Sequence, residues 1–462
     1  MLKRKIDNYL TQWKNNRKNA LIVYGARQIG KSYSIRKFIR NKENFDKYIE
    51  INFAERTNLI DTFATIEDSN QLLVRLSAIE GQKMVPYKTI IFFDEIQLIY
   101  TRRKELKENG TLSPKTQDIL TAMKALVEDG RYRFILSGSL LGILINDVVL
   151  NPTGYVDEYK MYPLDFEEFL WAKNVGQESI EYVKNCFINK EVVDEEINSL
   201  FHAYFKEYVL LGGMPEAVKI FKQTLNLHLV DVAQQNIIKY YNKDITTYIS
   251  DEGKRLRVRE IFEAIPSELN SRNKRYMSTH VVNINYLKRN SLDDEFLWLT
   301  NAGVAIPTYN VTEAILPLHL ASERKTMKLF MSDIGLLDSQ LLSTGIRQKI
   351  IDNEKVINYG APYENVVAQE LVAHGFDEEL FYYNSKKHGE VDFIVEYNND
   401  VLPIEIKSGK ADDSKLYNHS ALNNLIDIYK INESYVFGDG NFIKENENIY
   451  QFPIYMIDFL RK

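Results

Sequence analysis

The sequence predicts an α/β protein built of several domains, and three observations support this fold class. The chain has 462 residues, which is too many for a single hydrophobic core. In its first 170 residues, short apolar runs alternate with helical patterns, as expected for a parallel sheet that helices cover on both faces. Near the other end, two runs with an apolar residue at every second position flank Asn398-Asn399, a pair that suits a tight hairpin turn.

Composition and charge narrow the class of protein further. Hydrophobic residues make up 45% of the chain and charged residues 26%, which is ordinary for globular proteins. The net charge of -6 argues against a generally basic nucleic-acid binder. Cys186 is the single cysteine and forms no internal disulfide, so we expect the cytoplasm. We expect no membrane segment, because the most apolar stretch, 134–150, is interrupted by Asn146 and Asp147 and is shorter than the roughly 20 residues that span a bilayer.

Taken in order, the elements predict four segments. Four apolar runs in the first segment predict strands at 20–24, 48–54, 89–95 and 133–139. The second segment is expected to form a helical lid, because it is helical throughout, apart from a turn at Gly212-Gly213. In the third, helices precede an apparent β-hairpin, the pattern of a winged-helix-like module. The fourth begins with a helix and continues with strands. The segments are 1–165, 166–250, 251–345 and 346–462.

A phosphate-binding loop follows the first predicted strand. The pattern GxxxxGK[ST] is matched at each fixed position, directly after a strand and at the start of a helix. Glycines let backbone N–H groups turn toward phosphates, and the helix N-terminus favours negative charge. Lys31 is expected to reach the β- and γ-phosphates of ATP, and the Ser32 hydroxyl to bind Mg²⁺. The simpler alternative is a glycine turn with a surface lysine. The matched residues are Gly25, Ala26, Arg27, Gln28, Ile29, Gly30, Lys31 and Ser32.

Two acids and a serine complete the expected nucleotide site. Asp94 and Glu95 end the third apolar run, and an acid at the carboxyl end of a buried parallel strand faces the ligand crevice. Asp94 is expected to support Mg²⁺, and Glu95 to act as the catalytic residue that polarises the attacking water. Ser137 or Ser139, on the next strand, is expected to contact the γ-phosphate or this water. The alternatives are a solvated strand end and an ordinary loop hydroxyl. Arginine-finger candidates Arg131 and Arg133 stay unassigned.

Several stretches beyond the phosphate loop resemble a known family. "IIFFDEIQ", "YPLDFEEFL", "LGGMPEAV", "YENVVAQEL" and "PIEIKSGK" occur in the order seen in a group of prokaryotic AAA-type ATPases. The C-terminal domain of that group has unknown function and a restriction-endonuclease-like fold. The resemblance implies an ATPase and covers nearly the whole chain. Gly154 is followed by Tyr155 where the family often has arginine, which puts an arginine-dependent nucleotide sensor in doubt.

The C-terminal hairpin predicts its own register. If Asn398 and Asn399 form the turn, facing residues have numbers that sum to 797, and one face of the hairpin is wholly apolar. The apolar pairs are Val391–Ile406, Phe393–Ile404 and Val395–Leu402. On the opposite face Glu390 meets Lys407, and Asp392 meets Glu405. Facing carboxylates repel one another, and a bound Mg²⁺ would reverse that effect.

This D…ExK arrangement is the core of the PD-(D/E)xK nuclease pattern. Asp392 and Glu405 are expected to hold Mg²⁺ against a scissile phosphate, while Lys407 positions water or stabilises developing charge. Glu364 matches the family's helix acid and would complete the metal site. The alternative for the ExK pattern is an exposed ion pair on a strand. The fold itself does not imply cleavage, because a nuclease-like fold can persist as a binding or scaffold domain.

Partners other than ATP are less well defined by the sequence. Basic stretches at 253–260, 271–276 and 286–290 would grip a DNA backbone if they share a face, although solvated helix faces are the commoner explanation. We therefore keep two functions in view. In the first, an ATPase is coupled to a nuclease-like domain that acts on DNA. In the second, it is a switch or scaffold for a protein partner. A homo-oligomer is compatible with both.

Overall fold

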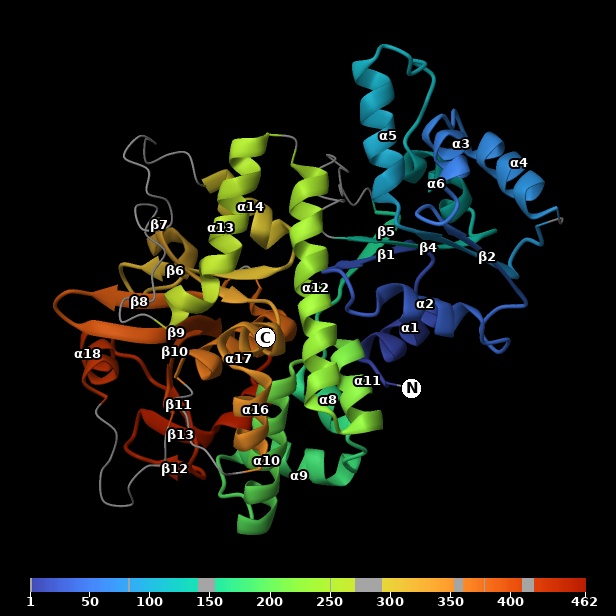
Figure 1. Ribbon diagram of the computed structural model, residues 1–462. Helices are drawn as coiled ribbons and strands as arrows, with labels where there is room; N and C mark the ends of the chain where they lie inside the picture. Colours follow the sequence, from blue (N-terminus) through green and yellow to red (C-terminus); the bar gives the residue numbers. More distant parts are fainter. Residues whose placement is uncertain are drawn as a thin grey trace. The chain divides into compact units, whose positions relative to one another are not determined.

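The computed structural model describes eight stretches of the chain, and these divide into two compact units. The described residues are 2–81, 84–139, 154–249, 251–270, 293–352, 360–377, 379–408 and 419–462. We call Lys3–Tyr162, with Asn301–Gly303, the N-terminal unit, and we call Pro163–Thr300 with Val304–Lys462 the C-terminal unit. The N-terminal unit is coloured blue to teal in Figure 1, and the C-terminal unit green to red.

The N-terminal unit contains a five-stranded parallel sheet. Its strands are β1 (Ala20–Gly25), β2 (Lys47–Asn52), β3 (Thr89–Asp94), β4 (Arg133–Ser139) and β5 (Val156–Lys160). They lie in the order β2-β3-β4-β1-β5, and each neighbouring pair is parallel. The four strands predicted from apolar runs are confirmed. Sequence reasoning missed β5, because "VDEYK" is a partly exposed edge strand without an apolar run.

Helices cover both faces of this sheet (Figure 1). Its main core joins the strands to helices on one face, and two helices lie on the other face, where α2 contacts β1 and β4. The first group is α3 (Ile60–Ala64), α4 (Ser69–Glu80), α5 (Gln97–Glu108) and α6 (Ile119–Glu128), and the second is α1 (Lys5–Asn16) and α2 (Lys31–Ile39). Every residue of β3 is buried, as expected for an inner strand of a doubly covered parallel sheet.

The C-terminal unit begins with a run of helices. The first six are α8 (Phe166–Ala172), α9 (Gln177–Asn189), α10 (Glu195–Leu211), α11 (Pro215–Thr224), α12 (Leu227–Tyr248) and α13 (Glu252–Leu269). The predicted turn between α10 and α11 is confirmed: Gly212 has a φ of 73°, and Pro215 occupies the first position of α11. Later helices are α14 (Asp293–Asn301), α15 (Ile334–Leu341), α16 (Thr344–Ile351), α17 (Gly360–Leu371) and α18 (Ser420–Tyr429).

An eight-stranded mixed sheet forms the other layer of this unit. Its order is β12-β13-β11-β10-β9-β8-β6-β7. The strands are β6 (Ala305–Val311), β7 (Ser322–Met331), β8 (Phe381–Ser385), β9 (Gly389–Tyr397), β10 (Asp400–Ile406), β11 (Ser434–Gly438), β12 (Ile443–Lys444) and β13 (Ile449–Pro453). Figure 1 shows yellow-orange β6 and β7 beside the orange strands β8 and β9.

The position of β6 and β7 bears on the winged-helix-like module expected at 251–345. The β6–β7 hairpin is present, and β6 also pairs in parallel with β8, so the hairpin belongs to the C-terminal sheet. The winged-helix assignment stays a prediction. Val311 of β6 belongs to a buried core of this sheet, in which α18 packs against β9, whereas β7 contacts α13, α15 and α17. The segment 271–292 lies outside the described residues.

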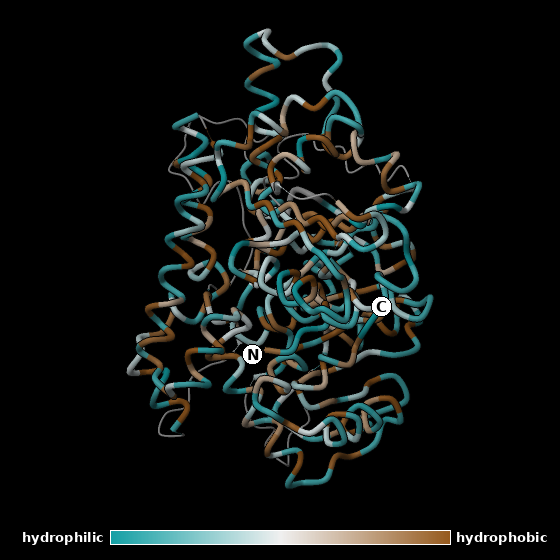
Figure 2. The backbone as a smooth tube through the Cα atoms, turned by 90° about the vertical axis from the view of Figure 1, so that its right-hand side faces the viewer, coloured by the Kyte–Doolittle hydropathy of each residue, from teal (hydrophilic) through white to brown (hydrophobic). Residues whose placement is uncertain are grey.

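Hydropathy follows the secondary structure. Along the helices, hydrophobic and hydrophilic stretches alternate within each turn in Figure 2, the pattern of helices that bury one face. No helix among the described residues is long and apolar enough to cross a membrane.

Candidate nucleotide and metal-binding sites

The phosphate loop connects the end of β1 to the start of α2. Three of its residues have left-handed backbone conformations: Gly25 (φ 150°), Gln28 (φ 66°) and Gly30 (φ 92°). Gly25 also lies against the backbone, since a Cβ there would be 2.2 Å from the carbonyl oxygen of Met161. Glycine at 25 and 30 is therefore required by geometry as well as by the pattern. Ala26, Arg27 and Ile29 supply the rest of the loop.

Lys31 is buried inside the phosphate loop. Its Nζ donates hydrogen bonds to the carbonyl oxygens of Gly25 (3.1 Å) and Ala26 (2.6 Å). Burial lowers the pKa of Lys31 to about 8, against the attraction of the Glu95 and Asp94 carboxylates. An anionic ligand in the loop would compensate this desolvation directly. The ammonium is therefore placed to favour a phosphate, as the sequence predicts.

Asp94 links the loop to the end of β3 and to β4. Its Oδ1 accepts hydrogen bonds from the hydroxyls of Ser32, at 2.9 Å, and Ser137. Its Oδ2 accepts hydrogen bonds from Arg36 and Asn52, each at 3.3 Å. Burial raises the pKa of Asp94, as does Glu95, while the two serines and Arg36 oppose the shift. The structure thus brings Ser32, Asp94 and Ser137 together.

Arg36 and Asn52 are the residues of this site that sequence reasoning missed. A signal was present for each. Arg36 lies four residues after Ser32, and therefore on the same face of α2, while Asn52 is the last residue of β2, beside the end of β3.

Glu95 follows Asp94 directly, where the chain leaves β3. It has a φ of 59°, a conformation that is uncommon for a non-glycine residue, and its carboxylate accepts a hydrogen bond from the Gln97 side chain. This turn separates Glu95 from the buried Asp94, so the two neighbouring acids have different partners. Ser139, the alternative to Ser137, is the buried last residue of β4.

The side chains and backbone groups at the phosphate loop fit ATP with Mg²⁺. The loop offers a buried ammonium, and α2 begins at Lys31, so its N-terminal N–H groups face the loop. Ser32 and Asp94 are oxygen donors 2.9 Å apart, the kind of ligand that Mg²⁺ prefers.

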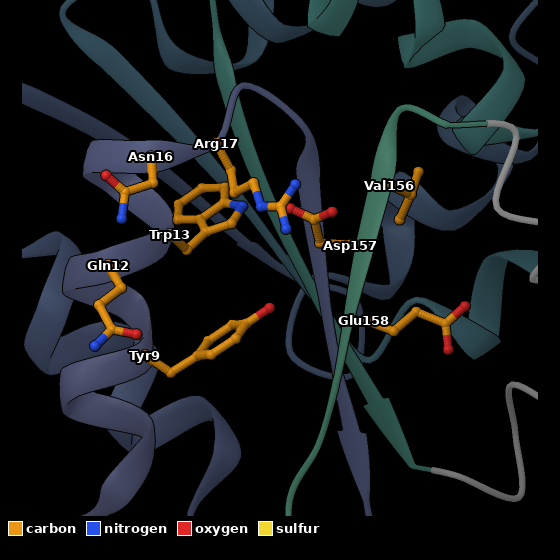
Figure 3. Close-up of a pocket in the computed structure, with 8 residues that line it drawn as sticks. All are labelled: Tyr9, Gln12, Trp13, Asn16, Arg17, Val156, Asp157 and Glu158. Carbon is orange, nitrogen blue, oxygen red and sulfur yellow. The ribbon is translucent and has the colours of Figure 1, made fainter.

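A separate pocket of about 640 Å³ lies between α1 and β5 (Figure 3). Tyr9, from α1, points toward β5 in this view. The pocket includes Val156, which pairs with Ala20, the first residue of β1. The phosphate loop follows the last residue of the same strand. The two sites therefore lie at opposite ends of the parallel strands, and this pocket is not the phosphate site.

The predicted C-terminal hairpin register is confirmed over the ladder that the structure shows. Ile404 pairs with Phe393, and Leu402 with Val395, as the sum of 797 requires. Asn398 and Asn399 form the turn, with φ values of 51° and 63°. Two consecutive positive φ values are typical of the turn that suits a two-residue hairpin.

The expected Asp392–Glu405 contact is not among the observed pairs. The β9–β10 ladder ends at Phe393, and the register of β8 against β9 shifts nearby. Asp392 Oδ2 instead accepts a hydrogen bond from the backbone N–H of Ile406 at 2.8 Å. Glu405 bonds to Lys407 and, at 2.9 Å, to His419. Burial opposes ionisation of Glu405, but bonds to His419 and Lys407 outweigh it and lower its pKa.

Lys328 is the residue of this region that sequence reasoning missed. It lies on β7, is fully buried, and its Nζ is 2.6 Å from Glu390 Oε1. Burial disfavours its charge, but the carboxylates of Glu364, Glu390 and Asp392 outweigh burial and raise its pKa. A lysine ammonium thus supplies positive charge where a metal ion was expected. It also takes the place of Lys407 as the partner of Glu390.

The predicted metal ligands of the C-terminal unit do not form one compact cluster among the described residues. Glu364 is buried on α17, which packs against β7 and β10. Among the described parts of the chain, Glu364, Asp392 and Glu405 are not a group of ligand atoms that all lie within 4.8 Å of one another.

The basic residues of α13 are also engaged: Arg257 pairs with buried Glu295 at 2.7 Å. The other two basic stretches lie outside the described residues.

Three family models match this chain. Residues 17–170 match an AAA domain, residues 202–347 match one domain of unknown function, and residues 359–457 match another. The first match contains the phosphate loop, Asp94, Glu95 and Ser137.

Two curated relatives cover most of the chain, and both are uncharacterised. One, from Methanocaldococcus jannaschii, is 25% identical over 82% of this chain and 73% of its own length. The other, from Haemophilus influenzae, is 25% identical over 71% of this chain and 70% of its own length.

Two solved structures were also found by their similarity in shape. The Aeropyrum pernix ORC1 protein in complex with DNA has 11% identity and a TM-score of 0.25, covering 74% of this chain and 92% of that one. The ADP form of the ORC2 protein from the same organism has 10% identity and a TM-score of 0.29, covering 77% and 94%. Similarity at this level carries no argument about function. The AAA-domain match and the geometry of the phosphate loop do support a function. Residues 17–170 are an AAA-type, ATP-binding P-loop domain.

Proposed function

We propose that this protein binds ATP with Mg²⁺ at the phosphate loop and hydrolyses it. The observation that carries this proposal is the 2.9 Å hydrogen bond from Ser32 to Asp94. It joins the hydroxyl of the phosphate loop to the acid at the end of β3, so two oxygen donors meet beside the buried ammonium of Lys31. The simpler alternative, a glycine turn with a surface lysine, would need neither the Ser32–Asp94 hydrogen bond nor the burial of Lys31.

Each residue has a role that follows from its position. Lys31 and the backbone N–H groups from Gly25 to Ser32 hold the phosphates. Ser32 and Asp94 would hold Mg²⁺, which when bound neutralises charge on the phosphate oxygens. Glu95 orients the attacking water and accepts its proton. Ser137 holds Asp94 through its hydroxyl, so that the Asp94 carboxylate keeps one orientation.

Lys31→Ala tests nucleotide binding. A charge-assisted hydrogen bond contributes about 1.5–3 kcal/mol, so we expect roughly a 10- to 150-fold loss of ATP affinity in a titration of the full chain. Lys37→Ala is the matched control: it removes a lysine from the same helix whose Nζ pairs with Asp7 at 2.7 Å. Equal ATP affinity in Lys31→Ala and wild type would refute the site.

For the C-terminal unit we propose a restriction-endonuclease-like fold that acts on nucleic acid with Mg²⁺. The hairpin register and the packing of α17, which carries Glu364, against β10 support it. In this proposal Glu364, Asp392 and Glu405 would bind the metal and Lys407 would position water, although the ligand atoms of the three acids do not all lie within 4.8 Å of one another among the described residues. Cleavage of linear, circular and single-stranded DNA with Mg²⁺ or Mn²⁺ is the test. Glu405→Ala should abolish it, while Glu447→Ala, a change of an exposed acid, should not.

One observation favours the second candidate, a switch or scaffold whose nuclease-like domain is inactive and holds a protein partner. Lys328 places a buried ammonium among three carboxylates, and Glu405 already pairs with His419 and Lys407. These side chains supply the charge that a catalytic Mg²⁺ would supply. The cleavage assay separates the candidates: no cleavage of any DNA by wild type, with unchanged DNA affinity in Glu405→Ala, favours the scaffold.

A further inference from the structure

Three buried side chains of the C-terminal unit meet at a point that the proposed sites do not use. Asp165 precedes α8, His374 lies in the π-helical segment η3 (Val372–Phe376), and Asp458 lies in the 3₁₀ helix η4 (Ile454–Phe459). One potential ligand atom of each lies within 4.8 Å of the other two. The non-helical backbone of His374 and the φ of 102° at Gly375 end the helical run here.

The spacing of these atoms suits a metal ion better than a hydrogen bond. His374 Nε2 is 3.5 Å from Asp165 Oδ2 and 3.4 Å from Asp458 Oδ1. Zn²⁺ binds imidazole nitrogen and carboxylate oxygen at about 2.0–2.2 Å, so two of its tetrahedral ligands lie about 3.4 Å apart. A direct N–H···O bond would be shorter, at about 2.7–3.2 Å.

Buried polar atoms at this point lack hydrogen-bond partners within the described part of the chain. They are both ring nitrogens of His374 and Asp458 Oδ2, although Asp458 Oδ2 lies 3.9 Å from the Arg461 guanidinium and His374 Nε2 lies within ion-pair distance of both aspartates. The side chains of His374 and Asp458 are 2% and 0% exposed, so water does not substitute freely. A buried polar group without a partner costs about 1–3 kcal/mol, and ligation at Nε2 would remove one such cost.

Backbone contacts hold the two aspartates in place. Asp165 Oδ1 accepts a hydrogen bond from the N–H of Glu168 at 2.9 Å, which leaves Oδ2 directed at His374. Asp458 Oδ1 accepts one from the N–H of Glu167 at 3.3 Å. Outer contacts of this kind orient ligands in metal sites.

Glu370 borders the same point. Its Oε2 is 3.8 Å from His374 Nε2, and its Oε1 is 2.7 Å from the hydroxyl of Tyr208. Asp165 and Asp458 supply two carboxylates to the point where His374 Nε2 lies.

We propose that Asp165, His374 and Asp458 form a structural site for a divalent transition-metal ion, with Zn²⁺ the best match. One imidazole and two carboxylates suit Zn²⁺, whereas Mg²⁺ prefers six oxygen ligands and gives up its water reluctantly. Glu370 or a water molecule completes the coordination. The ion would join the start of α8, the end of the α17–η3 run and the C-terminal segment, which are far apart in sequence.

The test uses the full chain without nucleotide, treated with a zinc-selective chelator in excess Mg²⁺. We expect one equivalent of Zn²⁺ to rebind, measured by titration and elemental analysis, and the melting temperature to rise on rebinding. If wild type takes up no Zn²⁺ and the chelator leaves its melting temperature unchanged, the three residues are an acid–histidine cluster and the proposal fails.

Two variants assign the site. Asp165→Asn keeps the cap of α8, because asparagine caps helices as well as aspartate does. It should weaken Zn²⁺ binding by more than the roughly 10- to 100-fold that loss of an outer contact produces. His374→Gln should do the same, and the exposed His228→Gln should not. Circular dichroism checks that Asp165→Asn is folded. Undiminished Zn²⁺ uptake by Asp165→Asn would place the ion elsewhere and overturn the proposal.

Discussion

Replacing Lys328 with methionine should strongly destabilise the C-terminal unit. Lys328 is fully buried, and three carboxylates, those of Glu364, Glu390 and Asp392, raise the pKa of its ammonium. Methionine keeps most of the side-chain volume, so the expected loss is electrostatic. Removing one partner of a fully buried ion pair costs about 3–5 kcal/mol, but the Glu390 side chain is 32% exposed, so solvent screens part of the loss and we expect about 1–3 kcal/mol.

Urea denaturation at pH 7, followed by circular dichroism, measures this loss. The pair at 2.6 Å can be isolated with Glu390→Gln: in a double-mutant cycle the two changes should be non-additive by about 0.5–3 kcal/mol. Mn²⁺ should restore part of the stability of Lys328→Met if the carboxylates can hold a metal. A loss below about 1 kcal/mol, the usual value for an exposed pair, would refute the account of Lys328.

Three further predictions follow from single contacts. Asp338 is buried, and burial raises its pKa to about 7. The folded state therefore binds more protons than the unfolded state between pH 3.8 and 7, so the free energy of unfolding falls as the pH rises. In urea denaturation, Asp338→Asn should stabilise the protein at pH 8, by at most about 4 kcal/mol, and leave it nearly unchanged below pH 4. Gly25→Ala should abolish ATP binding, because its Cβ would meet the Met161 carbonyl oxygen; normal affinity in a titration would contradict the loop geometry. Ser137→Ala should lower kcat about tenfold, with a smaller change in ATP affinity, since a buried hydrogen bond to the acid of the site is lost; an unchanged kcat in steady-state kinetics would remove Ser137 from the site.

The features that the sequence predicts correctly have local determinants. The phosphate loop is a contiguous pattern, and its glycines stand where the backbone has positive φ. The hairpin register followed from two-residue periodicity and the Asn398-Asn399 turn, because a slip by one residue would turn the apolar face outward.

Features that depend on tertiary pairing are not predicted by the sequence. The register predicts that Asp392 faces Glu405, but the ladder ends before that pair and each carboxylate has its own partner. The sequence does not predict the role of Lys328, because its strand, β7, is brought beside the others by the pairing of β6 with β8. Strand β5 lacks apolar periodicity, since an edge strand keeps partly exposed side chains.

The central claim is that Glu95 acts in ATP hydrolysis at a site whose nucleotide is held by other residues. ATP affinity and ATP turnover, measured side by side in Glu95→Gln and wild type, test it most directly. Glutamine keeps the shape of the side chain and removes the base, so the account predicts ATP affinity close to wild type and turnover lowered about 100-fold or more. Wild-type turnover in Glu95→Gln would contradict it.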